Sequence, residues 1–415
     1  MLLVLTAPAA AREILIADAP ALQSALENVQ PGDVLVLRDG EWRDVNIRLK
    51  GHGTKALPII LRAATPGKTI LTGSSSLRVG GEYIVIEGLF FSEPDPAQSD
   101  LIQFRIDSDE LAQHCQMTNC AVVSKQPIDN AGESRWVNLY GSGHQIDHCT
   151  FEGKTGKGAT LVVWLGASGG GGHHIDHNYF GPRKRLGSNG GETIRVGDSK
   201  TAGLTAGCVV ERNLFEKCNG ETECISNKSC GNTYRENTFL EVSGTLTLRH
   251  GSDCIVERNM FIGNDARGTG GIRIIGEDHV VRDNFLERLT GDDARSAICL
   301  MMGIPDSPAH RYRQVKRARI ENNTVVNCEH PLLIGLSDDK KATLPPIETV
   351  VRGNSVLAPK HTIVEARCTL DGILWEENRF SGKSLGIPRR DGIRTEVPPI
   401  PPGRPIERSQ VGTTW

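Results

Sequence analysis

The sequence lacks an excess of basic residues: 47 lysines and arginines stand against 50 aspartates and glutamates, so the formal net charge is −3. This balance excludes a strongly basic nucleic-acid-binding protein, although an acidic polymer can still bind through a local cationic groove. No apolar run is long enough to span a bilayer, so no membrane association is expected. Aromatic residues make up only 5% of the chain and 46 residues are glycine, which is typical of a soluble, turn-rich protein.

The cysteines lack the spacing of a stapled or zinc-binding module. Their number, eleven, is odd, and Cys218, Cys224 and Cys230 are six residues apart rather than paired as CxxC. Several stand where apolar residues recur, so we expect most of them to be buried thiols. A single disulfide stays open as an alternative.

The first eleven residues form a short apolar segment that ends in small residues before Arg12. This pattern is typical of the end of a signal peptide with cleavage near Ala11, which predicts a periplasmic or secreted protein. A short buried first strand is the alternative interpretation. The segment from Asp18 to about Val29 predicts an amphipathic helix, and short apolar strands follow at 34–37 and 59–61.

One phrase then recurs along the chain: an apolar residue, two polar residues, asparagine, a variable residue, and usually Phe or Val. Its asparagines are Asn178, Asn213, Asn237, Asn259, Asn284, Asn323, Asn354 and Asn378, with weaker copies at Asn119 and Cys149. The asparagines lie 35, 24, 22, 25, 39, 31 and 24 residues apart, which a basic turn of 22 to 25 residues with loop insertions explains. Leucine-rich repeats and propeller blades have other periods.

This period predicts an all-β protein, a right-handed single-stranded parallel β-helix over residues 12–385 whose first coil is covered by the N-terminal helix. Each asparagine would occupy the same bend and bond its neighbours in adjacent coils, or would merely favour left-handed backbone geometry there. Residues 386–415 are rich in proline, which cannot build ladder hydrogen bonds, so we expect an extended tail along the rod.

Charged residues gather in the middle coils. Glu221 and Glu223 are two residues apart, so in a strand they share a face and require a positive partner, for which calcium is the natural candidate. The second strand of four successive coils ends near a glycine and carries a cation two or three residues earlier: Arg195, Lys228, Arg249 and Arg273. Stacking lines these four along one wall, whereas any one alone indicates solvated surface.

The motif from Glu221 to Lys228, with Arg249, resembles polysaccharide lyase family 6, which contains alginate lyases and the dermatan-cleaving chondroitinase B. The resemblance covers residues 12 to 385. It implies that Asn189, Glu221 and Glu223 hold Ca²⁺, that Lys228 is the catalytic base and Arg249 the acid. It also implies that Arg273 and His250 bind substrate.

The expected reaction is calcium-assisted β-elimination on a uronate-containing anionic polysaccharide, since a cation beside the uronate carboxylate stabilises the transition state left by removal of the C5 proton. Arg195, Arg185 and Tyr312 are further candidates for substrate binding, the last two from the basic segments 182–185 and 310–313, whose charge can equally be solvated. Alginate is the expected substrate, dermatan sulfate the alternative, and a monomer the expected state.

Two other functions stay open. A β-helix hydrolase needs a pair of acids, for which Asp292 and Asp293 are the candidates, although this pair also suits a turn after Gly291. A glycan-binding solenoid without activity needs the groove but not Lys228.

Overall fold

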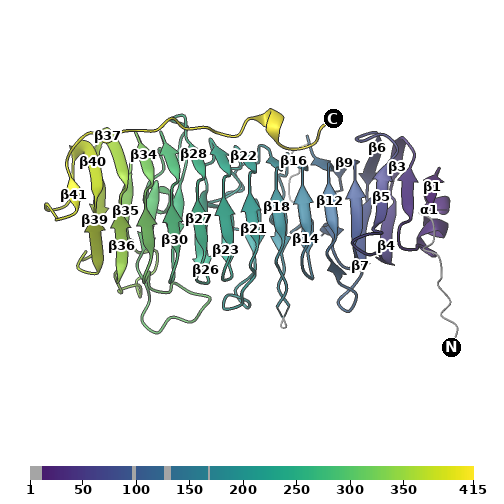
Figure 1. Ribbon diagram of the computed structural model, residues 1–415, viewed down its shortest axis with the longest axis horizontal. Helices are drawn as coiled ribbons and strands as arrows, with labels where there is room; N and C mark the ends of the chain where they lie inside the picture. Colours follow the sequence, from purple (N-terminus) through teal and green to yellow (C-terminus); the bar gives the residue numbers. More distant parts are fainter. Residues whose placement is uncertain (1–11, 96–99, 126–131, 167–168) are drawn as a thin grey trace.

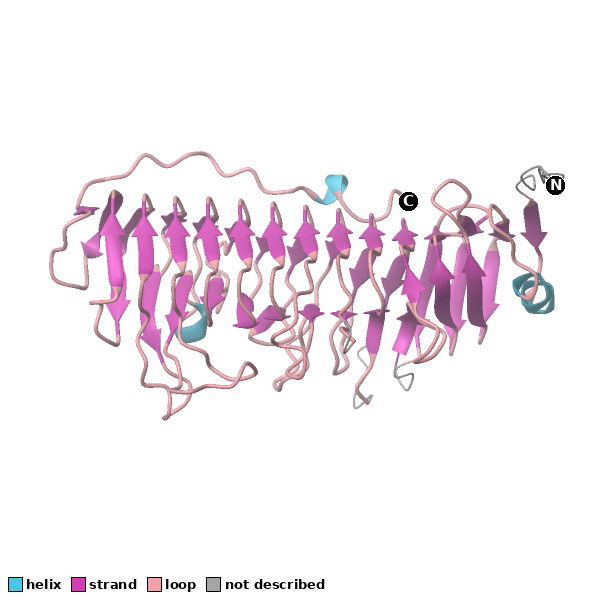
Figure 2. Cartoon of the chain, turned by 60° about the horizontal axis from the view of Figure 1, so that its bottom comes forward, coloured by secondary structure: helices cyan, strands magenta, loops and turns pink. Residues whose placement is uncertain are grey.

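The computed structural model describes residues 12–95, 100–125, 132–166 and 169–415, and the predicted signal-peptide remnant lies outside them. The chain winds into a long rod built from three parallel sheets, each receiving one strand from each coil (Figures 1 and 2). The prediction of a right-handed parallel β-helix is confirmed.

Each sheet runs the length of the rod, and its strands follow one another in the spatial order below. Sheet 1 contains β1 (Glu13–Ile16), β2 (Val34–Leu37), β5 (Ile59–Ala63), β8 (Ile84–Glu87), β12 (Gln116–Thr118), β15 (Gln145–Asp147), β18 (His174–Asp176), β21 (Val209–Glu211), β24 (Thr233–Arg235), β27 (Ile255–Glu257), β30 (Val280–Arg282), β33 (Arg319–Glu321), β36 (Thr349–Arg352) and β39 (Ile373–Glu376). Sheet 2 contains β11 (Ala112–Gln113), β7 (Ser76–Glu82), β10 (Asp100–Gln103), β14 (Arg135–Leu139), β17 (Leu161–Val163), β20 (Ile194–Val196), β23 (Glu223–Lys228), β26 (Thr245–His250), β29 (Ile272–Ile274), β32 (Ile298–Met301), β35 (Leu332–Leu336) and β38 (Val364–Ala366), with β4 (Asn46–His52) also paired to β7. Sheet 3 contains β3 (Gly40–Arg43), β6 (Thr69–Gly73), β9 (Leu89–Pro94), β13 (Ala121–Val123), β16 (Thr150–Glu152), β19 (Tyr179–Phe180), β22 (Leu214–Glu216), β25 (Thr238–Leu240), β28 (Met260–Ile262), β31 (Phe285–Glu287), β34 (Thr324–Val326), β37 (Ser355–Thr362), β40 (Asn378–Ser384) and β41 (Ile393–Arg394).

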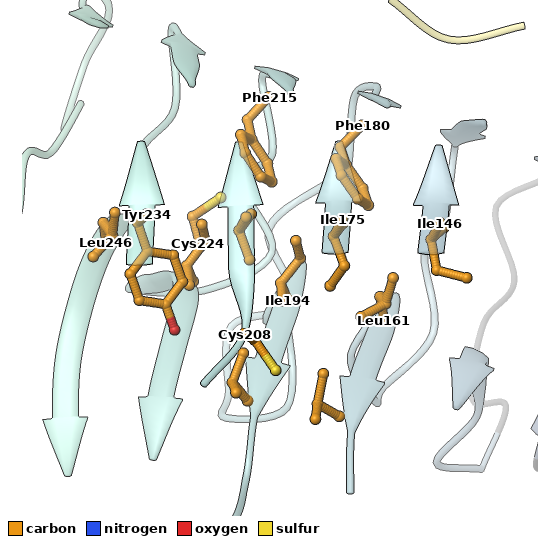
Figure 3. Close-up of a cluster of buried hydrophobic side chains, with 14 of the residues drawn as sticks. Ile146, Leu161, Ile175, Phe180, Ile194, Cys208, Phe215, Cys224, Tyr234 and Leu246 are labelled. Atoms are coloured by element: carbon orange, nitrogen blue, oxygen red, sulfur yellow. The ribbon is translucent and has the colours of Figure 1, made fainter. Parts of the chain in front are cut away.

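The core lies inside the coil and consists of stacked side chains from successive turns (Figure 3). Phe180, Phe215, Phe239 and Phe261 form one continuous stack, with neighbouring ring centroids 4.5 to 4.9 Å apart. All eleven cysteines are free and nine of them are buried, so the expectation of buried thiols is confirmed.

The repeated asparagines form a buried ladder at the bend between sheets 1 and 3. In each step the side-chain oxygen of one asparagine accepts from the backbone N–H and the side-chain amide of the previous one, as Asn284 does for Asn259 at 3.0 Å. The amide also donates to a backbone carbonyl of the preceding coil, such as Tyr234 O for Asn259. The ladder therefore satisfies polar groups that a dry bend would otherwise leave unpaired.

The left-handed residue of this bend is the one before each asparagine, as in Arg212 at φ 51° and Arg258 at φ 52°, so the ladder asparagines are not chosen for left-handed geometry. For the same reason the weak copy at Asn119 was placed one residue too early. Asn119 has φ 52°, and Cys120 occupies the ladder position. Asn119 instead accepts from the backbone N–H of Thr414 in the tail.

The capping helix α1 (Ala19–Leu26) covers the first coil, and the side chain of Asp18 accepts the backbone N–H of Ala21 at its start. The helix ends three residues earlier than expected. Pro31 disfavours helical geometry in the residue before it, and the chain turns there because Asp33 accepts from the backbone N–H of Gln30 and pairs with Arg12. Among the described residues, no helix is long and apolar enough to cross a membrane.

The C-terminal segment turns back after β41 and runs along the rod beside sheet 3, with the 3₁₀ turn η2 (Arg408–Gln410) on the way (Figure 1). It is fastened by hydrogen bonds to the coils, among them those of the backbone N–H groups of Ile406 with Thr238 and Thr413 with Thr150. A cavity of about 620 Å³ lies between Pro401–Arg404 and the coils beneath. This cavity is on the side of sheet 3, whereas the charged wall is on sheet 2.

A second ladder precedes the strands of sheet 1 and uses histidine. The Nδ1 atoms of His144 and His279 accept the backbone N–H groups of Cys115 and Cys254, each at 3.2 Å, while Asn232 accepts from Cys208 at the equivalent position. Burial lowers the pKa of His144 and of His279 to about 4. Both rings are therefore neutral acceptors at neutral pH.

This ladder predicts acid sensitivity. Because the folded pKa of His279 is lower than the value of about 6.5 in an unfolded chain, its contribution is complete above pH 6.5 and is lost as the pH falls towards 4. His279→Asn supplies the acceptor that Asn232 uses and cannot titrate. In urea unfolding, the free energy of unfolding of this variant should be lower than that of the wild type at pH 6.5. The difference should shrink by about 2 to 3 kcal/mol between pH 6.5 and 4.5, since only the wild type loses stability as His279 takes up a proton. An unchanged deficit would contradict the assignment.

Candidate active site

A polar cleft of about 710 Å³ opens on the outer face of sheet 2, over β23, β26 and β29. Two irregularities of β23 shape it: pairing with β26 shifts register between Glu223 and Ile225, and again between Asn227 and Lys228. The second shift leaves Arg249 as an extra residue between Leu248 and His250. Such bulges re-aim side chains, so Glu223 and Arg249 reach the same cleft from adjacent strands.

Three carboxylates meet at one end of the cleft, those of Glu192, Glu221 and Glu223. Glu221 lies in the bend before β23 rather than in the strand, where it had been expected, and it accepts the backbone N–H of Gly190 at 3.1 Å. Burial, together with repulsion from Glu192 and Glu223, raises the pKa of the Glu221 carboxyl to about 7. The cluster of three carboxylates therefore lacks enough positive charge nearby to balance it.

This donor set suits a hard cation. Asn189 lines the cleft beside the three carboxylates, so all the donors are oxygens, which calcium prefers. Within the described ranges, no three His, Cys, Asp or Glu side chains already stand in the arrangement of a metal site. The excess negative charge at Glu221 is thus the structural observation that fits a cation here.

Lys228 and the two arginines stand against these carboxylates. Lys228 Nζ lies 3.9 Å from Glu192 Oε1, and Arg249 Nε lies 3.6 Å from Glu223 Oε1. Arg273 is buried between Glu223, at 3.8 Å, and Asp338, with which it forms a close ion pair. The amine and both guanidinium groups therefore face the cleft together.

His250 and Tyr312 complete its walls. The ring of Tyr312, on the loop between β32 and β33, lies 4.3 Å from the Arg249 guanidinium carbon. Burial and the charges of Arg249 and Lys228 lower the pKa of His250 to about 3, so the imidazole is neutral. Its buried Nδ1 has no hydrogen-bond partner in the described part of the chain.

Other expected residues lie elsewhere. Arg195, in β20, stands beside the cleft against Trp164, and Arg185 lines a smaller adjoining pocket with Asn189 and Glu221. The basic segment 182–185 was expected either to bind the polymer or to be solvated, and for Arg183 both expectations are wrong. Arg183 is buried, and it donates to the backbone carbonyls of Gly158 at 2.8 Å and Glu192 at 2.5 Å, so it fixes the backbone that carries Glu192.

The acidic pair at 292–293 does line the cleft, at the 3₁₀ turn η1 (Asp293–Arg295). Asp293 is held by an ion pair with Arg367 at 2.7 Å, so it acts in the fold of this turn. The same turn brings in Arg295, which no sequence pattern singled out. Arg295 donates to the hydroxyl of Thr222 at 2.9 Å, between the two glutamates.

Sequence reasoning also missed Glu192 and Asp338. Glu192 stands three residues after Asn189 and three before Arg195. Its place between these two candidate residues was the one feature of the sequence that could have identified it as part of the site. Asp338 follows β35, and no local pattern links it to Arg273, 65 residues earlier.

Comparison with known proteins places this chain in a family. The family model described as Chondroitinase B matches residues 16–400. A variant of the PL6 family alginate lyase AlyGC is 36% identical over 97% of this chain, with a TM-score of 0.92, and the chain spans 59% of its length. A mannuronic acid specific polysaccharide family 6 lyase from human gut microbiota is 32% identical, with 94% of this chain and 92% of that chain covered and a TM-score of 0.84.

No curated protein sequence matches the chain. The family model nevertheless covers almost all of the β-helix, and two solved structures agree with it in sequence and in fold. The chain therefore belongs to polysaccharide lyase family 6.

Proposed function

We propose that the protein is a polysaccharide lyase that cleaves a uronate-containing polysaccharide, with alginate as the preferred substrate, by calcium-assisted β-elimination. The observation that carries this proposal is the meeting, in one cleft, of an oxygen donor group with Lys228 and Arg249. An amine and a guanidinium on one face of a sugar acid suit removal of a carbon-bound proton and departure of an oxygen.

In the reaction, the C5–H and C4–O bonds break and a C4–C5 double bond forms. Calcium held by Asn189, Glu221 and Glu223 would neutralise the uronate carboxylate and so favour loss of the C5 proton. Lys228 accepts that proton on Nζ as the uncharged amine, so its ion pair with Glu192 has to separate and its own proton has to leave to solvent first. Arg249 donates hydrogen bonds to the departing O4, and water supplies its proton, because an arginine side chain hardly releases one.

The remaining residues orient the sugar. Arg273 is already compensated by Glu223 and Asp338, so it offers a carboxylate only the donors that these two leave free. His250, being neutral, suits a hydroxyl as well as a carboxylate.

Alginate is favoured because both of the solved relatives described above are named as acting on it or on mannuronic acid. Dermatan sulfate is the second candidate, since the matching family model is that of Chondroitinase B.

The test is to incubate the protein with alginate and with dermatan sulfate, and to follow both the ultraviolet absorbance of unsaturated uronates and the release of reducing ends. A lyase produces both signals together. Reducing ends without absorbance would indicate hydrolysis, and neither signal with either polymer would leave only binding. Either of these results would refute the proposal.

A further inference from the structure

We propose that a column of stacked side chains on the N-terminal side of the cleft, Arg105, Tyr140, Trp164 and Arg195, binds the substrate over about four sugar residues beyond the reacting one. This inference rests on the proposed lyase function. In this arrangement the bound polymer lies on the outer face of sheet 2, parallel to the axis of the rod.

The register of sheet 2 leads from the column to the catalytic lysine. Leu139 pairs with Val163, Val163 with Val196, and Val196 with Asn227. The next residues in these strands are Tyr140, Trp164, Gly197 and Lys228, which therefore follow one another along the outer face. Gly197 adds no side chain to this order, so the rings of Tyr140 and Trp164 are followed directly by the amine of Lys228.

The column is held rigidly. The rings of Tyr140 and Trp164 stack with centroids 5.9 Å apart and planes 7° apart. The Arg105 guanidinium lies 3.8 Å from the Tyr140 ring at one end, and that of Arg195 lies 4.7 Å from the Trp164 ring at the other. Trp164 is fixed by its Nε1–H, which donates to the fully buried Asn138 at 2.9 Å.

Charge distinguishes the two end arginines from their neighbour. Arg135, which also lies over Trp164, is paired with Asp100 and Glu133. Within the described part of the chain, by contrast, neither Arg105 nor Arg195 forms an ion pair, and the buried Nε of Arg195 lacks a hydrogen-bond partner. A guanidinium over an aromatic ring can still offer the N–H groups at its edge to a carboxylate.

The spacing suits an acidic polymer. Arg195 lies one coil before Lys228, and Arg105 lies three coils before Arg195. Coils in a parallel sheet rise about 4.8 Å each, so the two free cations are roughly 14 Å apart. One sugar residue advances a polysaccharide by nearly the rise of one coil, so Arg195 and Arg105 can each meet a uronate of the same chain.

The test compares Arg105→Ala and Trp164→Ala with the wild type on saturated oligouronates of three to eight residues prepared from alginate. We expect the loss in kcat/KM to grow with length and to reach about tenfold on the longest, equivalent to about 1.4 kcal/mol. Trp164→Tyr, which keeps a ring, should recover most of it. Arg379→Ala, on sheet 3, is the matched control. A loss that is equal at all lengths, or absent, would overturn the inference.

Binding separates this inference from the proposed function. In the Lys228→Ala background, affinity for the same oligomers, measured by calorimetry, should rise with length and should lose that rise when Arg105→Ala is added. Failure of the wild type to form unsaturated ends would refute the lyase while leaving this binding result intact. Affinity that does not depend on length, or on Arg105, would refute the column alone.

Discussion

Lys228→Ala is expected to lower formation of unsaturated uronate ends by about 10²- to 10⁴-fold, the contribution of a positioned general base. Lys228 Nζ faces the carboxylate cluster and lies 3.9 Å from Glu192 Oε1. The side chain lies on the outer face of β23, so its removal leaves the core and the asparagine ladder intact. The melting temperature should therefore stay close to that of the wild type.

Two further variants isolate the role of the amine. Lys228→Arg keeps the positive charge but cannot accept a proton, so it should lose nearly as much activity as the alanine variant. Lys217→Ala, which removes an exposed lysine paired with Glu241 on the side of sheet 3, should be fully active. Retained turnover in Lys228→Arg would show that the charge, rather than proton transfer, matters at this position.

Removal of calcium is expected to have the second largest effect. Dialysis against a chelator should reduce turnover at least about 100-fold, since each electrostatic partner of a developing charge contributes on this scale. Added Ca²⁺ should restore it. Calcium at 100 times its dissociation constant should also stabilise the fold by about 2.7 kcal/mol, which is measurable as a rise in melting temperature without any substrate.

The variant Glu221→Gln separates calcium binding from general stability. In chelator it should be at least as stable as the wild type, because it removes a charge at a position where burial, together with repulsion from Glu192 and Glu223, raises the pKa of Glu221 to about 7. With Ca²⁺ it should gain little. Glu287→Gln, on β31 in sheet 3, is the control and should respond to Ca²⁺ like the wild type. If the melting temperature of the wild type did not change on addition of Ca²⁺, calcium binding at Glu221 would be excluded.

Much of the fold was accessible from the sequence because the coil repeats itself. The asparagine phrase marks one bend per coil, and the core strands alternate or run apolar as a stacked coil requires. The errors were local. Asn119 was placed in the ladder although Cys120 occupies it, since the phrase does not distinguish the left-handed residue from the residue that follows it. The end of α1 was placed too late because apolar spacing continues beyond the residue at which the chain turns.

The site was predicted only in part, because spacing along the chain does not report burial or strand irregularity. Lys228 and Arg249 do reach one cleft, but through a register shift that no pattern predicts. Arg183 resembled a solvated loop cation and is instead a buried donor to backbone carbonyls. Asp338 and Arg295 enter from loops whose distance in sequence hides their contact with Arg273 and Thr222.

The sequence by itself determined the rod: its period sets one coil after another, and parallel pairing then fixes which strands are neighbours. Tertiary structure alone decided which charges confront one another. Burial strengthens the repulsion among Glu192, Glu221 and Glu223. The fold also places Arg105 and Arg195, at the two ends of the stacked column, where no carboxylate among the described residues pairs with them. Electrostatic energy depends on distance and on exclusion of water, and both are properties of the folded wall rather than of the order of residues.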